Sequence, residues 1–164
     1  MPNSARKAHV LVVDDDDSVR VTATALLEES FDVEAARSGE EAIVWLQTHE
    51  VDVVCADFRM PGMTGLELLE KVTRRYAHVS CVLVTGHRDF LGTGSARGLS
   101  YSVLLKPYQA DELVERVRRA AQLTEIKRSI SRQSAAPRSE VRATTRSAHT
   151  PGALASFALP RRRP

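Results

Sequence analysis

The chain has 164 residues, of which 43% are hydrophobic and 5% aromatic, which is enough for one domain with a core and a tail. Its net charge of +2 conceals two opposed parts: residues 127–164 carry nine basic residues and one glutamate, whereas residues 1–126 carry 14 basic and 20 acidic residues. The basic character therefore belongs to the tail. The larger part of the chain, residues 1–126, is acidic, and its charge does not favour binding to nucleic acid.

No apolar run has the length of a signal peptide or a membrane-spanning helix. We therefore expect a cytoplasmic protein without a membrane partner. The two cysteines, Cys55 and Cys81, lie inside apolar, strand-like runs. This placement predicts buried, reduced thiols rather than a disulfide or a metal-binding pair.

Five short apolar runs predict five β-strands. They occupy residues 10–13, 31–36, 51–57, 79–84 and 100–105. The first stops at four consecutive aspartates, because like charges of this kind cannot continue into a buried strand. The third is rich in valine, is expected to be buried on both faces, and ends in the single carboxylate of Asp57.

Helical patterns follow each of these runs. The first is capped by Asp16 or Asp17, and the second starts at a capping box of Ser38 and Glu41. The third begins at Gly65. A fourth, over residues 88–98, should be short or distorted because it contains three glycines. The fifth runs from about residue 110 to 126 or beyond.

Alternating strands and helices predict an α/β fold with a doubly wound, parallel five-stranded sheet, a (βα)5 arrangement in the flavodoxin-like order 2-1-3-4-5. We assign residues 8–126 to this domain. Residues 130–164 are rich in Arg, Ser, Ala and Pro, and we expect them to form a disordered tail.

Polar side chains follow four neighbouring strands of the predicted sheet. Asp14 and Asp15 follow the first strand, Asp57 ends the third, Thr85 follows the fourth and Lys106 the fifth. Since parallel strands end at one edge, these side chains should converge. Three close carboxylates raise one another's pKa unless a cation relieves them, and Mg²⁺ suits an all-oxygen site. A carboxylate nucleophile, a metal, an ammonium and a hydroxyl are the groups that phosphoryl transfer uses.

Four segments together resemble the receiver domain of bacterial two-component response regulators, of the single-domain, chemotaxis-regulator type. They are LVVDDDDSVR, VVCADFRMPGMTGLELL, CVLVTGH and LLKPY, in this order and at the family's spacing. The resemblance implies that Asp57 is the phosphoacceptor. It also implies a Mg²⁺ site in which Asp15, Asp57 and the backbone carbonyl of Arg59 are direct ligands and Asp14 holds the metal through water.

The same resemblance implies roles for three further residues of these segments. Thr85 corresponds to the switch hydroxyl, Lys106 to the lysine that contacts a phosphoryl oxygen, and Pro107 to a cis-proline. One position departs from the family pattern: the aromatic residue three positions before the lysine is Val103 here. Tyr101 is on the same face of the strand but one pleat further from the site.

The resemblance implies a stand-alone receiver that accepts a phosphoryl group from a sensor histidine kinase or a histidine phosphotransfer protein. It would catalyse only its own phosphorylation and dephosphorylation, and it would signal to a downstream protein through the face formed by its fourth and fifth helices. Two alternatives stay open. One is an adaptor that works without phosphorylation, and the other is a regulator that binds nucleic acid through the basic tail, although the tail lacks a helix-turn-helix pattern and interleaved aromatic residues.

Overall fold

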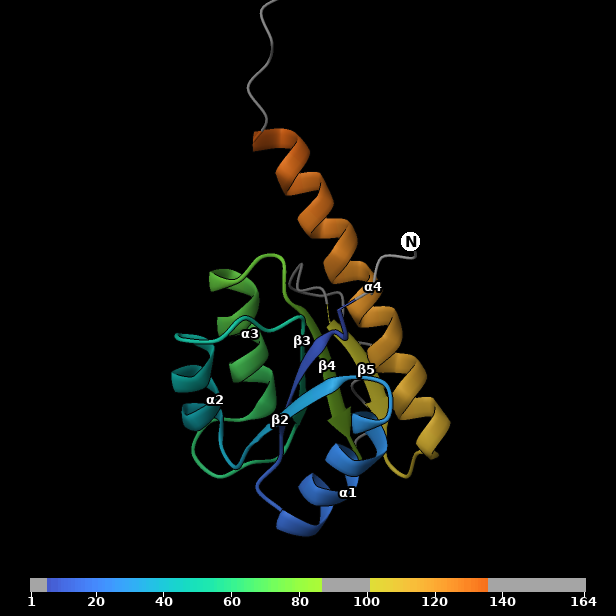
Figure 1. The fold of residues 1–164 in the computed structure, drawn as a ribbon. Helices are drawn as coiled ribbons and strands as arrows, with labels where there is room; N and C mark the ends of the chain where they lie inside the picture. Colours follow the sequence, from blue (N-terminus) through green and yellow to red (C-terminus); the bar gives the residue numbers. More distant parts are fainter. Residues whose placement is uncertain (1–5, 87–100, 136–164) are drawn as a thin grey trace, which may run out of the picture.

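The structure of the protein, a computed structural model, describes residues 6–86 and 101–135. Strands and helices alternate along these ranges (Figure 1). In chain order they are β1 (His9–Val13), α1 (Asp17–Glu28), β2 (Asp32–Ala36), α2 (Gly39–Leu46), β3 (Val53–Asp57), α3 (Gly65–Arg75), β4 (Ser80–Thr85), β5 (Tyr101–Leu105) and α4 (Ala110–Ala135).

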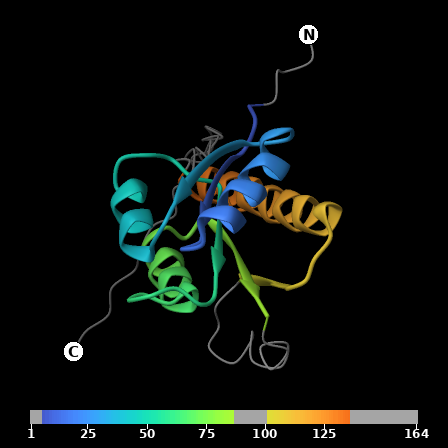
Figure 2. The same cartoon turned by 90° about the horizontal axis from the view of Figure 1, so that it is seen from below.

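The five strands form one parallel sheet in the order β2-β1-β3-β4-β5, which confirms the predicted order. Helices α1 and α4 cover one face of the sheet, and α2 and α3 cover the other (Figure 2). Each face has its own apolar core. Leu27, Phe31 and Leu113 lie in the core under α1 and α4, whereas Leu68 and Val72 lie in the core under α2 and α3.

Burial along the strands follows their place in the sheet. Every residue of the central strands β3 and β4 is buried, because helices cover both faces there. The edge strand β2 exposes three of its five residues, as its alternating sequence predicts. Cys55 of β3 and Cys81 of β4 are buried free thiols, as expected from their position in apolar runs.

Side-chain caps fix the starts of the first three helices. Asp16 caps α1, and its carboxylate accepts the N–H groups of Ser18 and Val19 at 2.8 and 3.2 Å. Ser38 caps α2, but only half of the predicted capping box forms there, because Glu41 accepts the N–H of Arg37 (2.7 Å) instead of that of Ser38. A complete capping box, which we did not predict, lies at the start of α3.

In that capping box the Thr64 hydroxyl accepts the N–H of Glu67 at 3.3 Å, and the Glu67 carboxylate accepts the N–H of Thr64 at 2.9 Å. The box thus satisfies two of the N–H groups that every helix start leaves without an intrahelical partner. It also fixes the start of α3 at Gly65, the residue after the Thr64 cap.

Helix α4 corrects the predicted boundary of the tail. Its inward residues Leu113, Val117 and Ala120 are buried as predicted, but the helix continues to Ala135, so residues 130–135 belong to the helix and not to a disordered tail. The polar composition of residues 130–135 suggested a tail. The helix nevertheless continues through them, because polar contacts earlier in α4 hold the helix against the sheet. The predicted helix at 88–98 and the remaining tail, 136–164, lie outside the described residues.

Thr124 of α4 fixes the helix to the amino-terminal edge of the sheet. Its buried hydroxyl donates to the carbonyl of Asp52 (2.7 Å) and accepts the N–H of Ser80 (3.1 Å). One turn later, Arg128 forms a hydrogen-bonded ion pair with the Asp52 carboxylate. Within residues 6–86 and 101–135, no helix is long and apolar enough to cross a membrane.

Candidate functional site

Asp57 lies at the carboxyl end of β3, in the middle of the sheet edge, and is 9% exposed. One of its carboxylate oxygens, Oδ2, accepts the N–H of Arg59 at 2.7 Å. After the loop of residues 58–64, α3 starts close to the end of β3, because its first residue, Gly65, packs against the backbone of Asp57. A Cβ on Gly65 would lie 2.0 Å from the Asp57 carbonyl oxygen, so only glycine fits there.

Lys106 reaches the same carboxylate from the end of β5. Its Nζ donates to Oδ1 of Asp57 at 2.5 Å and lies 3.6 Å from Oδ2 of Asp14. Its backbone N–H donates to the carbonyl of Thr85 at 2.8 Å, which ties the ends of β5 and β4 together. The peptide bond between Lys106 and Pro107 is cis, as the resemblance implied.

Asp14 is buried at the end of β1, and its Oδ1 accepts the N–H of Asp16 at 2.9 Å. The Arg20 guanidinium donates to the Asp14 carbonyl at 2.7 Å, a contact that we did not predict. Burial raises the pKa of Asp14, and the charges of Asp57 and Asp15 add to the rise, whereas the Asp16 N–H and Lys106 oppose it. Asp15 itself is exposed.

The balance of charge at this edge favours a further cation. Burial lowers the pKa of Lys106, but its hydrogen bond with Asp57 and the charges of Asp57 and Asp14 outweigh this, so the pKa lies above the usual 10.5. One ammonium therefore faces two nearly buried carboxylates, with Asp15 next to them in the chain. All the candidate donors are oxygens, and each carboxylate oxygen can accept a second partner. The residues thus fit a hard divalent ion such as Mg²⁺.

Two carboxylates meet at Lys106, and the third predicted one does not join them. In the described part of the chain, no three acidic, histidine or cysteine side chains surround a point where one metal ion could be held. The assignment of Asp14, Asp15, Asp57 and the Arg59 carbonyl as metal ligands stays a prediction.

Thr85 is buried at the end of β4, next to the site, and pairs in register with Leu105 of β5. Val103 pairs with Leu83, and Tyr101 with Cys81. Tyr101 therefore stands four residues from the level of Thr85, about 13 Å along the strand. Its ring packs against the core under α2 and α3. Two residues before the level of Thr85, β5 thus presents Val103 where the family pattern has an aromatic residue.

The family profile named "Response regulator receiver domain" matches residues 10–118, well over half of the chain. The protein therefore belongs to the response regulator receiver family. The fold and the placement of Asp14, Asp57, Thr85 and Lys106 at one edge agree with this assignment.

Two curated relatives illustrate the family. The hydrogenase transcriptional regulatory protein HoxA of Cupriavidus necator is 34% identical over 122 residues, which are 73% of this chain and 25% of that protein. The DNA-binding transcriptional regulator NtrC of Klebsiella pneumoniae is 37% identical over 111 residues, 66% of this chain and 24% of that protein. The chain thus spans about a quarter of the length of these relatives.

Solved structures of receiver domains share the fold over most of their length. The chemotaxis response regulator CheY4 of Vibrio cholerae is 30% identical with a TM-score of 0.63, and the match covers 70% of this chain and 98% of that one. The signal receiver domain of an HD domain-containing protein from Pseudomonas fluorescens is 26% identical with a TM-score of 0.71, covering 79% and 97%.

Proposed function

We propose that Asp57 is a phosphoacceptor and that the protein relays signals in a two-component system of the cytoplasm. The donor is a phosphohistidine on a sensor histidine kinase or a phosphotransfer protein. The observation that carries this proposal is the Asp57 carboxylate at the carboxyl edge of the sheet, with Lys106 Nζ at 2.5 Å and Asp14 on the other side of that ammonium.

The side chains around Asp57 have separate tasks in this reaction. The N–H of Arg59 holds Oδ2, so the plane of the carboxylate is fixed before the donor arrives. An Asp57 oxygen attacks phosphorus as the bond to the histidine nitrogen breaks. Lys106 then neutralises charge on a phosphoryl oxygen, and the Thr85 hydroxyl donates to another.

A Mg²⁺ ion completes this site in the proposal. Asp14, Asp15, Asp57 and the carbonyl of Arg59 would hold it, and when bound it offsets the negative charge of the carboxylates and the phosphoryl group. The excess of carboxylates over ammonium groups at this edge supports this part of the proposal.

Phosphorylation then changes how the protein binds a downstream partner. The affected face contains β5 and α4, because the backbone bond between Lys106 and Thr85 connects the site to the end of β5. The domain acts on its own phosphorylation and dephosphorylation and not on a separate substrate.

Labelled acetyl phosphate with Mg²⁺ tests the proposal directly. We expect Asp57→Asn to reduce incorporation to the background, at least about 100-fold, because the nucleophile is lost. Asp111→Asn, which changes an exposed carboxylate of α4, is the matched control and should be labelled like the wild type. Equal labelling of Asp57→Asn and the wild type would overturn the assignment.

Val103 supports a second candidate, an adaptor of the same fold that binds its partner without phosphorylation. A β5 without an aromatic residue next to Thr85 lacks the family's usual link from the site to the surface. Partner binding separates the two functions. The wild type and Asp57→Asn are each measured with and without acetyl phosphate. Under the phosphoacceptor proposal, acetyl phosphate changes the partner affinity of the wild type and not that of Asp57→Asn. An adaptor binds its partner with the same affinity in all four samples.

A further inference from the structure

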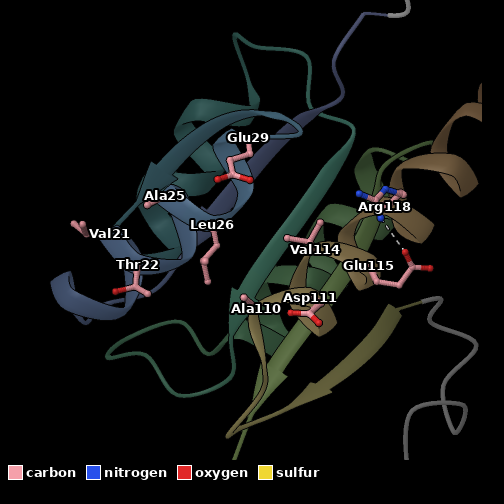
Figure 3. Close-up of a pocket in the computed structure, with 10 residues that line it drawn as sticks. All are labelled: Val21, Thr22, Ala25, Leu26, Glu29, Ala110, Asp111, Val114, Glu115 and Arg118. Atoms are coloured by element: carbon pink, nitrogen blue, oxygen red, sulfur yellow. Dashed lines mark hydrogen bonds and ion pairs between the residues drawn. The ribbon is translucent and has the colours of Figure 1, made fainter.

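Helices α1 and α4 lie side by side on one face of the sheet, and a groove of about 700 Å³ runs between them (Figure 3). We call it the α1–α4 groove. Its apolar lining comes from Ala25 and Leu26 of α1 and from Ala110 and Val114 of α4. Leu26 and Val114 point toward each other across it (Figure 3). Val21, also part of the lining, is 65% exposed.

The polar lining of this groove is acidic. Glu29, Asp111 and Glu115 contribute three carboxylates, and Arg118 is the only cation of the lining. Arg118 already forms an ion pair with Glu115 at 3.0 Å, so Glu29 and Asp111 dominate the charge offered to an occupant. The groove therefore suits a segment with a few apolar side chains followed by positive charges.

The sequence contains such a segment in residues 153–163, ALASFALPRRR. Residues 136–164 have four large apolar side chains, and three of them, Leu154, Phe157 and Leu159, fall in this segment. Leu154 and Phe157 have the i, i+3 spacing that places two side chains on one side of a helix. Arg161, Arg162 and Arg163 follow directly and supply three positive charges.

The chain is long enough for this segment to reach the groove. From Ala135 back to Val114 the helix measures about 32 Å. The 17 residues at positions 136–152 span up to about 56 Å when extended. A tethered segment meets its site at an effective concentration on the order of millimolar, so even a weak contact is occupied.

We propose that residues 153–163 dock in the α1–α4 groove of the same molecule. Leu154 and Phe157 cover Leu26 and Val114, and the arginines lie beside Glu29 and Asp111. Burial of the apolar side chains supplies most of the attraction, and the opposite charges of the arginines and the groove carboxylates add to it. This contact goes beyond the proposed phosphorylation, since it uses no residue of that site.

A spin label tests the contact in the 164-residue protein. Ser156→Cys carries the nitroxide. Burial raises the pKa of Cys55 to about 12 and that of Cys81 to about 11, so the native thiols stay unlabelled. We expect the amide NMR signals of residues 21–26 and 110–114 to lose at least half of their intensity, whereas those of α2 keep theirs.

Two pairs of variants separate docking from general attraction. The first pair changes charge. Changing Arg161, Arg162 and Arg163 together to Glu should reduce the broadening of the groove signals at least threefold. The matched control changes Arg138, Arg142 and Arg146 to Glu and should leave the broadening unchanged. Val21→Glu should also reduce it, and Val44→Glu on α2 should not; both valines are 65% exposed, so neither change disturbs the core.

Three results would overturn the proposal. The first is broadening that shows no preference for the groove. The second is broadening centred on the exposed apolar residues of α4, namely Leu123, Ile126 and Ile130. The third is broadening that appears equally when the label and the isotope are on different molecules, because the occupant would then be a second copy. Broadening confined to the groove and independent of protein concentration supports it.

Discussion

Strand β3 connects two nearly buried carboxylates with opposite surroundings. Asp52 lies just before the strand, at the amino-terminal edge of the sheet, and is 5% exposed. Its oxygens bind the guanidinium groups of Arg6 (3.0 Å) and Arg128 and the N–H of His9 (2.8 Å). Two cations thus contact one carboxylate at this edge.

The carboxyl-terminal edge reverses this ratio. Asp57 ends the strand, and the Lys106 ammonium that contacts it also faces Asp14. One cation thus contacts two carboxylates. Asp57 is the reactive carboxylate of the proposed function, and the comparison teaches that burial alone would not distinguish it from a structural one such as Asp52. A carboxylate with a surplus of cations holds elements together, whereas one that shares its cation keeps capacity for an incoming ion or phosphoryl group.

The largest expected effect concerns the backbone of the carboxyl-terminal edge. Gly65→Ala would place a Cβ 2.0 Å from the carbonyl oxygen of Asp57, and backbone atoms cannot move aside cheaply. We expect the free energy of unfolding in urea to fall by at least about 3 kcal/mol. Gly86→Ala is the control at the same edge. Among the described residues its Cβ would have no neighbour within 4 Å, so wild-type stability is expected, and equal losses in both variants would contradict the prediction.

Asparagine substitutions at the two ends of β3 should have opposite effects: one variant should lose stability and keep labelling, and the other should keep stability and lose labelling. Asp52→Asn removes the charge that two guanidinium groups share, and we expect it to cost about 2 kcal/mol of stability while leaving labelling by acetyl phosphate intact. Asp57→Asn removes one of two carboxylates that compete for Lys106, so its stability should change by less than about 1 kcal/mol while labelling is lost. Urea unfolding and labelling of both variants measure this. A loss of labelling in a folded Asp52→Asn would break the comparison.

A smaller effect is expected from Thr124, which joins α4 to the amino-terminal edge. Thr124→Val keeps the shape of the side chain but removes the bond to the Asp52 carbonyl and one of the two acceptors of the Ser80 N–H, which also donates to the Asp52 carbonyl at 3.1 Å. We expect a loss of about 1–2 kcal/mol in urea unfolding. In Thr22→Val an exposed hydroxyl loses its bond to the Ser18 carbonyl, and this control should stay within about 0.5 kcal/mol of the wild type.

The smallest effect is a change in pH dependence at the amino-terminal edge. Burial, and then the charge of Arg128, lower the pKa of His78 below its usual 6.5, against the charges of Asp52 and Glu50. The unfolded chain therefore takes up this proton more readily than the folded one. The contribution to stability is present above pH 6.5 and is lost as the pH falls below it.

His78→Gln should accordingly flatten the decline in Tm between about pH 7 and pH 5. At about pH 8 the histidine is neutral in both states, and the variant should then match the wild type. Parallel Tm profiles of the two proteins across this range would contradict the prediction.

The sequence was sufficient to predict the parts of the molecule that depend on local pattern and parallel topology. Valine-rich runs indicate buried strands, and the ends of parallel strands must meet, so Asp14, Asp57 and Lys106 could be brought together before the structure was known. Asp15 follows Asp14 in the chain and is exposed, and its role as a metal ligand stays a prediction.

Long-range side-chain contacts could not be predicted in the same way. Arg6 and Arg128 lie 46 and 76 residues from Asp52 in the chain, and no local pattern links either of them to it. Such contacts also explain the error at the end of α4. The Ser- and Arg-rich composition after residue 129 suggested a tail, whereas Thr124 and Arg128 hold the helix against the sheet and allow it to continue.

The length of α4 has a mechanical consequence. Arg128 makes the last ion pair of the helix with the sheet, and the seven residues from there to Ala135 extend about 10 Å further. This end moves with any tilt of the helix about its contacts with the amino-terminal edge. A tilt of about 10° at Arg128 moves the tip by about 2 Å, roughly one residue's rise of helix. Small rearrangements of the sheet are thus magnified where the chain leaves the domain.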